Sequence, residues 1–158
     1  MPGRKRSLVA WQEKSSLVRS QEDRLDLHAE DTHMIKVINM YRDEIPELSG
    51  RTLAGLPAAR WPDGYVYIGR AGKGLPGHWG NPIEIGKPCP ECGIAHDRNA
   101  TLQCYEHWMR RRILSEQDLR EKLLALDGMT LVCFCSPKPC HGHVLSRLVE
   151  EIKSAHRP

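Results

Sequence analysis

Three cysteines and two histidines lie within eleven residues of this chain, from Cys133 to His143. An apolar run at 129–132 comes directly before this segment, and an apolar segment with helical spacing at 144–152 comes directly after it. The pattern predicts a buried strand that turns straight into a helix. In open α/β sheets, ligands bind beyond the carboxyl ends of the strands, so the segment predicts both a fold class and the place of a site.

Other segments extend the α/β pattern. The predicted elements are strands at 65–68 and 129–134, and helices at 99–114, 115–126 and 142–153. Because two strands make a thin sheet, further strands are expected within 50–60 or 83–86. A right-handed crossover is the usual connection between parallel strands. We therefore expect a small single α/β domain with a short parallel sheet flanked by helices, plus an N-terminal helical and basic extension.

The first part of the chain is interpreted as an addition to this domain. Residues 1–24 hold six Arg and Lys against three Asp and Glu, which is typical of a solvated tail or of a basic arm for nucleic acid. Residues 25–48 have helical spacing, so 25–60 is predicted to be a helical extension and linker. The α/β core is placed at 61–158, with a Cys-rich insertion at 87–97.

Composition narrows the class of protein. The net charge of +3 and the pI near 8.6 permit a nucleotide or nucleic-acid partner without demanding one. No apolar run approaches the roughly 18 residues of a membrane helix, and the N-terminus lacks the apolar core of a secretory signal. We expect a cytoplasmic protein that does not enter a membrane. Six cysteines in such a chain indicate metal ligands or reactive thiols rather than disulfides.

Cys89 and Cys92 form the sharpest metal motif, a Cys-x₂-Cys turn followed by glycine. Two thiolates at this spacing can reach one tetrahedral ion. His96 is the nearest third ligand, and Cys104 on the next predicted helix is a candidate fourth. The motif predicts a structural zinc ion, with a loop carrying two free thiols as the alternative.

A second candidate group follows the strand at 129–134 and consists of Cys133, Cys135, Cys140 and His141, with His143 beside it. Three interpretations stay open. The group can hold a zinc ion, which would be catalytic if one position stayed open for water. It can be metal-free, with a thiolate favoured at the helix N-terminus and a histidine as base. The strand cysteines can also be ordinary buried residues.

The glycine-rich loop at 69–82 is the third candidate element. Arg70 can bind a phosphate or carboxylate, Trp79 can stack on a base, and Asn81 can contact a base or sugar edge. The alternative is a structural turn in which Trp79 is buried.

Taken together, these pieces resemble a domain-of-unknown-function family of phages and bacteria. The matching pieces are Tyr67-Ile-Gly-Arg70, Trp79-Gly-Asn-Pro82, an Arg98 leading into a helix with Tyr105, Leu131-Val-Cys-Phe-Cys135 and Pro139-Cys-His-Gly142. The family positions in this chain are Arg70, Trp79, Asn81, Arg98, Cys133, Cys135, Cys140 and His141. Ile83 stands where the family usually has Phe, and the Cys89/Cys92 turn looks like an addition that would brace the fold locally.

The resemblance implies a fold and a site without naming a reaction, and phage ancestry favours a nucleotide or nucleic acid as target. The first hypothesis is therefore an enzyme-like domain. Arg70 and Arg98 would hold an anionic substrate, Asn81 would orient it, and Cys140 and His141 would carry the chemistry or a catalytic zinc.

The second hypothesis is a non-catalytic, zinc-stabilised phage protein. In it the thiols only brace the fold. The basic arm and the arginines at 110–112 would bind nucleic acid or a host protein.

Overall fold

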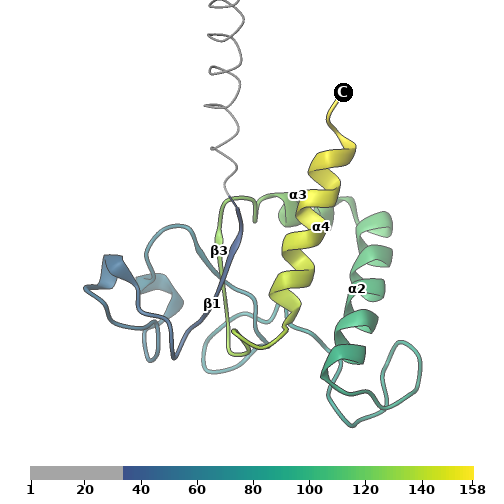
Figure 1. Ribbon diagram of the computed structural model, residues 1–158, viewed down its shortest axis with the longest axis horizontal. Coiled ribbons are helices and arrows are strands. Elements are labelled where there is room, and N and C mark those ends of the chain that lie inside the picture. The colour runs from purple at the N-terminus through teal and green to yellow at the C-terminus, as the bar shows by residue number, and fades with distance from the viewer. Residues whose placement is uncertain (1–33) are drawn as a thin grey trace, which may run out of the picture. The chain divides into compact units, whose positions relative to one another are not determined.

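The computed structural model describes residues 34–158 and contains one parallel sheet (Figure 1). Its strands are β1 (Lys36–Asn39), β2 (Tyr65–Tyr67) and β3 (Thr130–Cys133), in the order β1-β3-β2. Leu131 of β3 pairs with Val37 on one side and with Val66 on the other. The predicted small α/β fold with a parallel sheet is confirmed. The basic arm at 1–24 lies outside the described residues.

Three helices lie together on one side of the sheet (Figure 1). They are α2 (Arg98–Ser115), α3 (Gln117–Leu124) and α4 (His141–Ala155). Leu131 and Cys133 of β3 face these helices and are fully buried with Leu145 and Tyr105. Among residues 34–158, no helix combines the length and the apolar character that crossing a membrane requires.

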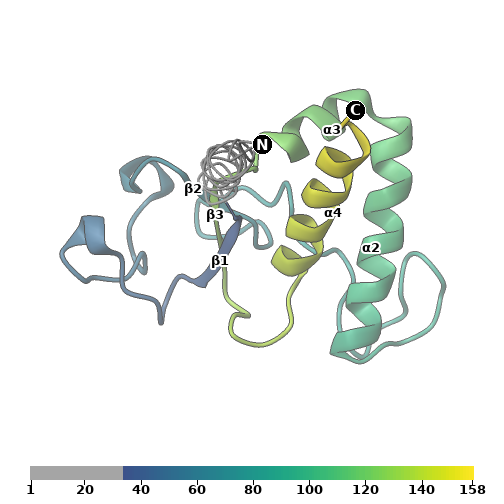
Figure 2. The ribbon, with the colours of Figure 1, turned by 45° about the horizontal axis from the view of Figure 1, so that its top comes forward.

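The opposite face of the sheet is covered by the segment that joins β1 to β2, which lies away from the helices in both ribbon views (Figure 2). This segment contains two short 3-10 helices, Pro46–Leu48 and Ala58–Arg60. Val132 of β3 points to this side and packs with Ile38 and Leu53. Side chains alternate across a strand, so β3 is buried on both faces, as its continuous apolar sequence predicts.

The helix predicted over 25–48 is wrong where the structure describes it. Residues 36–39 form β1, and the last residues of the range form a 3-10 turn. The part of that range before residue 34 lies outside the described residues. Apolar residues at positions 34, 35, 38 and 41 fit helical spacing, but a short apolar run buried on both faces has no reliable period.

The strands expected within 50–60 or 83–86 are also wrong. The first range ends in a 3-10 turn, and the second has no strand. Ile83 bonds instead to side chains: its N–H donates to Asn81 Oδ1, and its carbonyl accepts from Arg70 Nη2. The third strand of the sheet is β1, from the region interpreted as an extension.

Helix α4 approaches the sheet closely at Gly142. A Cβ added there would lie 2.8 Å from Ile68 Cδ1 and 2.9 Å from Val37 Cγ1. Both distances are shorter than side chains tolerate, so the glycine sets the position of the N-terminus of α4.

We expect Gly142→Ala to destabilise the protein by about 1–3 kcal/mol through overpacking. In an open helix the same change would instead stabilise by about 1 kcal/mol. Urea unfolding measures the difference, and Ser146→Ala on the same helix is the matched control, expected to be near neutral. A Gly142→Ala variant as stable as wild type would contradict the close approach of α4.

Candidate functional site

Four potential metal ligands converge beside the N-terminal half of α2. The ligand atoms of Cys89, Cys92, His96 and Cys104 all lie within 4.8 Å of one another. Cys92 Sγ is 2.9 Å from His96 Nε2 and 3.8 Å from Cys104 Sγ. The prediction that these residues form one group is confirmed, including the fourth position on the next helix. The arrangement is compatible with a metal site.

A tight turn presents the first two cysteines of this group. The carbonyl of Cys89 accepts a hydrogen bond from Gly93 N, and the N–H of Cys89 donates one to the carbonyl of Ile94. Gly93 has a φ of 78°, in the left-handed region that favours glycine. Cys104 comes from α2, so the group joins the 87–97 segment to that helix. Burial, followed by hydrogen bonds with Cys92 and Cys89, raises the pKa of the Cys104 thiol to about 11.

A pocket of about 280 Å³ opens at the carboxyl edge of the sheet. The residues that line it come from the loops after β2 and β3 and from the first turns of α2 and α4. They are Gly69, Arg70, Asn81, Ile83, Ile85, Arg98, Thr101, Leu102, Phe134, Cys135, Pro139, Cys140 and His141. The structure thus brings together most of the residues singled out in the sequence, at the edge where parallel strands bind ligands.

Arg70 is held in a fixed orientation at this pocket. Its Nε donates to Asn81 O at 2.7 Å, and its Nη2 donates to Ile83 O at 2.9 Å. Gly80 allows the approach, because a Cβ there would lie 2.9 Å from Arg70 Cα. Asn81 is buried, and its Oδ1 accepts from Ile83 N at 2.9 Å. The two residues therefore organise one wall together.

Arg98 is the first residue of α2 and supplies the second cation of the pocket. No ion pair among the described residues includes Arg70 or Arg98. Thr101 and Leu102 line the pocket one helical turn further on. The sequence reading missed these two residues, although the i, i+3, i+4 spacing from Arg98 places them on the same face.

Cys133 and Cys140 form a buried thiol pair with their sulfur atoms 3.6 Å apart. Cys133 ends β3, and Cys140 is the N-cap of α4. The hydrogen bond from Cys140 lowers the pKa of Cys133 to about 6, and the same bond raises the pKa of Cys140. The pair therefore loses its first proton at a lower pH than an ordinary thiol does.

His141 lies next to this pair and is buried against Tyr105, with ring centroids 5.5 Å apart. Its Nε2 forms a hydrogen bond with the carbonyl of Ile68. A carbonyl only accepts, so Nε2 carries the proton and Nδ1 is the acceptor of the neutral ring. Burial lowers the pKa of His141, which also favours the neutral ring.

The structure does not gather the second predicted metal group in the same way. Among the described residues, the convergent set of three or more ligands is the one around Cys92. Cys133 and Cys140 meet, while Cys135 lies partly buried at the pocket wall and His141 Nε2 is engaged by Ile68 O. A metal at these four residues stays a prediction.

Trp79 is 5% exposed and belongs to the core on the helix side of the sheet. Its carbonyl accepts from the Tyr105 hydroxyl at 2.7 Å, which ties the 69–82 loop to α2. Trp79 does not line the pocket in this structure. Its surroundings therefore fit a structural turn with a buried Trp79 better than they fit base stacking.

The family model for a domain of unknown function, DUF4326, matches residues 56–151, which is more than half of the chain. The chain belongs to this family. The expected membership of an uncharacterised domain family is therefore confirmed, whereas the individual signature motifs stay a prediction. The DUF4326 match spans the pocket, the metal-ligand group and strands β2 and β3.

A phage protein is also similar to this DUF4326 chain. It is an uncharacterised 12.4 kDa protein from the nrdA-td intergenic region of Enterobacteria phage T4, with 35% identity over 74 residues. The matched part is 47% of this chain and 61% of the phage protein, so the chain covers less than two thirds of that relative. No solved structure matches the chain significantly.

The thiol pair makes a testable prediction about pH. One thiolate should appear as the pH rises through about 6, and ultraviolet thiolate absorbance should record it in the native protein. Cys140→Ala removes the donor to Cys133, so this step should move up toward the ordinary thiol pKa of about 8.5. Cys135→Ala is the control and should keep the low step. An unchanged titration in Cys140→Ala would show that the pair does not share a proton.

Proposed function

We propose that the chain is a small α/β enzyme-like domain whose pocket binds a nucleotide, free or within a nucleic acid, through its phosphate. The observation that carries this proposal is the charge of the pocket. Arg70 and Arg98 line it, and none of its described lining residues is acidic. The first turns of α2 and α4 also reach it, and helix N-termini favour anions.

Arg70 is suited to an anion because its orientation is already fixed. A guanidinium has five N–H donors, and two of those of Arg70 are used on the carbonyls of Asn81 and Ile83. The remaining donors can form a bidentate contact with phosphate. The carboxylate of Glu84 is paired with Lys87, which lowers its pKa first, and the charge of Arg70 lowers that pKa by a smaller amount.

The buried groups beside these cations would carry the chemistry. The Cys133–Cys140 pair can supply a thiolate on Cys133 near neutral pH, and Cys140, which lines the pocket, stays the thiol that donates to it. His141 lines it as a neutral ring with Nδ1 as an acceptor, which suits a general base. Asn81 can orient the substrate through its amide nitrogen, because its Oδ1 is engaged by Ile83 N.

We further propose that the Cys89 group holds zinc as a structural ion. Tetrahedral zinc with bonds of about 2.3 Å to sulfur and about 2.0 Å to nitrogen requires neighbouring sulfurs about 3.8 Å apart. The 3.8 Å between Cys92 and Cys104 matches this requirement, whereas His96 Nε2 lies 2.9 and 3.2 Å from these two sulfurs, closer than the roughly 3.5 Å that the same bond lengths give. Four protein ligands fill a tetrahedral sphere, which is typical of a bracing site.

The alternative of a binding protein without catalysis receives less support from the arginines at 110–112. Arg110 pairs with Glu106 and Glu151, Arg111 with Glu91, and Arg112 with Glu116. Arg112 also lies over the Trp108 ring. Paired cations contribute less to a basic surface than free ones do.

The proposed anion pocket can be tested by removing one of its two cations. Arg98→Ala should weaken binding of nucleoside 5′-monophosphates at least tenfold, because a hydrogen bond to a charged group is worth about 1.5–3 kcal/mol. Isothermal titration calorimetry measures the affinity. The control is Arg157→Ala just past the C-terminal end of α4, about 20 Å from its N-terminus along a helix that rises about 1.5 Å per residue. Equal weakening in both variants would contradict a pocket-specific contact.

The zinc proposal has its own test. Protein purified without added metal should contain one zinc ion, measured by elemental mass spectrometry, and Cys92→Ser/Cys104→Ser should lose it. Zinc at 1,000 times its dissociation constant stabilises the folded state by about 4 kcal/mol, so the melting temperature should fall by about 10 °C in the double variant. Cys135→Ser is the control and should keep the ion. A full zinc content in the double variant would place the metal elsewhere.

A further inference from the structure

A second hollow of about 580 Å³ lies beside the anion pocket and shares two lining residues with it, Arg70 and Phe134. Its volume is within the range of small-molecule sites, about 300–1,000 Å³. It is bounded on one side by the loop after β2 and on the other by residues 55–57. The two hollows therefore meet at one cation and one aromatic ring.

Aromatic side chains from the ends of all three strands line this second hollow. Tyr41 follows β1, Tyr67 ends β2, and Phe134 follows β3. The Tyr41 and Phe134 rings are stacked with centroids 5.4 Å apart, and Tyr67 meets Phe134 edge-on at 5.7 Å. Tyr41 is 50% exposed and Phe134 is 43% exposed, so the stacked pair keeps apolar ring surface open to solvent.

Buried hydrogen bonds hold these two exposed rings in place. Asn39 is 4% exposed, and its Nδ2 donates to the carbonyls of Phe134 at 2.9 Å and Ser136 at 2.8 Å. Its Oδ1 accepts from Tyr41 N at 2.9 Å. One side chain at the end of β1 therefore fixes the backbone on both sides of the platform. Preorganised aromatic contacts cost less entropy when a ligand binds.

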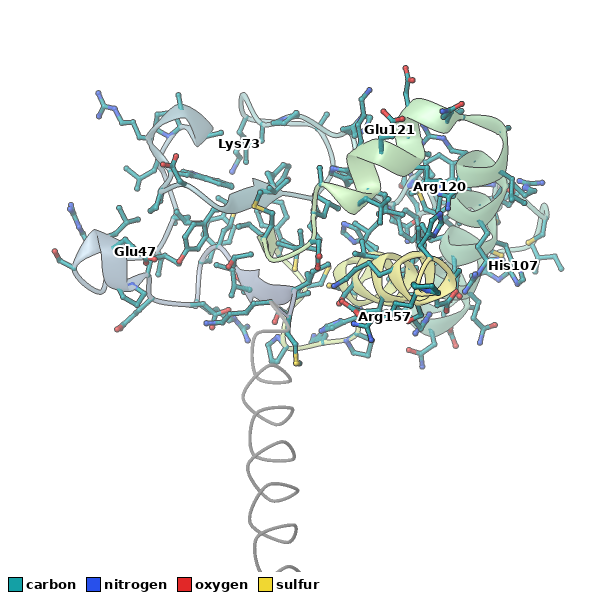
Figure 3. All side chains as sticks on the ribbon, turned by 90° about the horizontal axis from the view of Figure 1, so that it is seen from above. Glu47, Lys73, His107, Arg120, Glu121 and Arg157 are labelled. Carbon is teal, nitrogen blue, oxygen red and sulfur yellow. The ribbon has the colours of Figure 1, made fainter. Side chains whose placement is uncertain are left out.

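The charged side chains that line the hollow are both cations, and the Asp43 carboxylate, which accepts from Asn39 N at 2.6 Å, is not among its lining residues. Arg70 and Lys73 line the hollow, and none of its described lining residues is acidic. Lys73 lies on the loop side of the molecule, away from the helices (Figure 3). A ligand that matches both features has a flat ring joined to an anionic group. Nucleotides have this chemistry, whereas an apolar peptide would leave the cations without partners.

We propose that this hollow is the base subsite of the nucleotide site, with the base packed against the open ring surface of the Phe134–Tyr41 stack while the phosphate lies between Arg70 and Arg98. This inference rests on the proposed function and specifies its substrate class as a single nucleotide unit. Stacking on an aromatic ring tolerates any base, so the subsite contributes affinity more than base selectivity. Phe134 and Tyr41 thus take the base-stacking role that the sequence had suggested for Trp79.

The experiment compares ligands with and without a base on the full chain. Calorimetry is run with inorganic phosphate, ribose 5-phosphate, the four nucleoside 5′-monophosphates, adenosine and uridine. At least one monophosphate should bind wild type about tenfold more tightly than ribose 5-phosphate, a difference of about 1.4 kcal/mol. Phe134→Ala and Phe134→Leu should both abolish that difference, with ribose 5-phosphate binding measured in each variant as its own reference. Arg157→Ala, which lies outside both hollows, is the control and should keep the difference.

Two results would overturn the base subsite while leaving the phosphate pocket intact. Either the monophosphates bind wild type no better than ribose 5-phosphate, or their advantage survives both Phe134 variants in protein that melts as wild type does. The experiment can also show the converse result, in which the phosphate pocket fails and the base subsite holds. If adenosine or uridine bound in a Phe134-dependent way while inorganic phosphate and ribose 5-phosphate did not bind, the base subsite would stand and the phosphate pocket would fall. No binding of any ligand would overturn both.

Discussion

Strand β3 is hydrogen-bonded along both edges, to β1 on one side and to β2 on the other, and it is buried on both faces. A central parallel strand fixes the direction of its neighbours, so the carboxyl ends of all three strands meet at one edge of the sheet. The chain leaves β3 at Cys133 and enters α4 at His141. The register of this one strand therefore determines where the rest of the candidate site lies.

The pocket wall depends on two tertiary attachments. Tyr105 of α2 donates to the carbonyl of Trp79, which anchors the loop that carries Arg70. Cys104, one residue earlier on the same helix, meets Cys92 and His96 of the Cys-rich segment. Helix α2 thus supplies Arg98 to the pocket and also holds the two segments that approach it. A metal in the Cys group would stiffen the attachment of the Cys-rich segment to α2 without lining the pocket.

Polar groups at this edge are satisfied mainly by backbone carbonyls. Arg70 donates to two of them, Asn39 to two, and His141 bonds to that of Ile68. Among the described residues, no buried side-chain nitrogen or oxygen lacks a partner. Because irregular backbone after a short strand has unpaired carbonyls, long polar side chains at these positions stabilise the loops and orient the site at once.

Much of this architecture could be predicted from local sequence. The Cys-x₂-Cys turn and its two further ligands are close in sequence, so spacing alone brought them together correctly. Strands β2 and β3 and helices α2 and α4 have clear periods and were predicted within a few residues. The helix predicted over 115–126 begins two residues later, at Gln117, because Glu116 is its N-cap and the Ser115 hydroxyl donates back to the carbonyl of Arg111.

Other features depended on contacts between distant residues. The sequence determined which segments carry ligands, cations and glycines, because those properties belong to single residues and short spacings. The tertiary structure decided that residues 36–39 are a strand, since only pairing with β3, about ninety positions later, separates a strand from a helix there. It likewise decided that Trp79 is buried while Phe134 is exposed, and that Cys133 meets Cys140. Which side of a residue faces solvent is set by what packs against it, and that partner is not its neighbour in the chain.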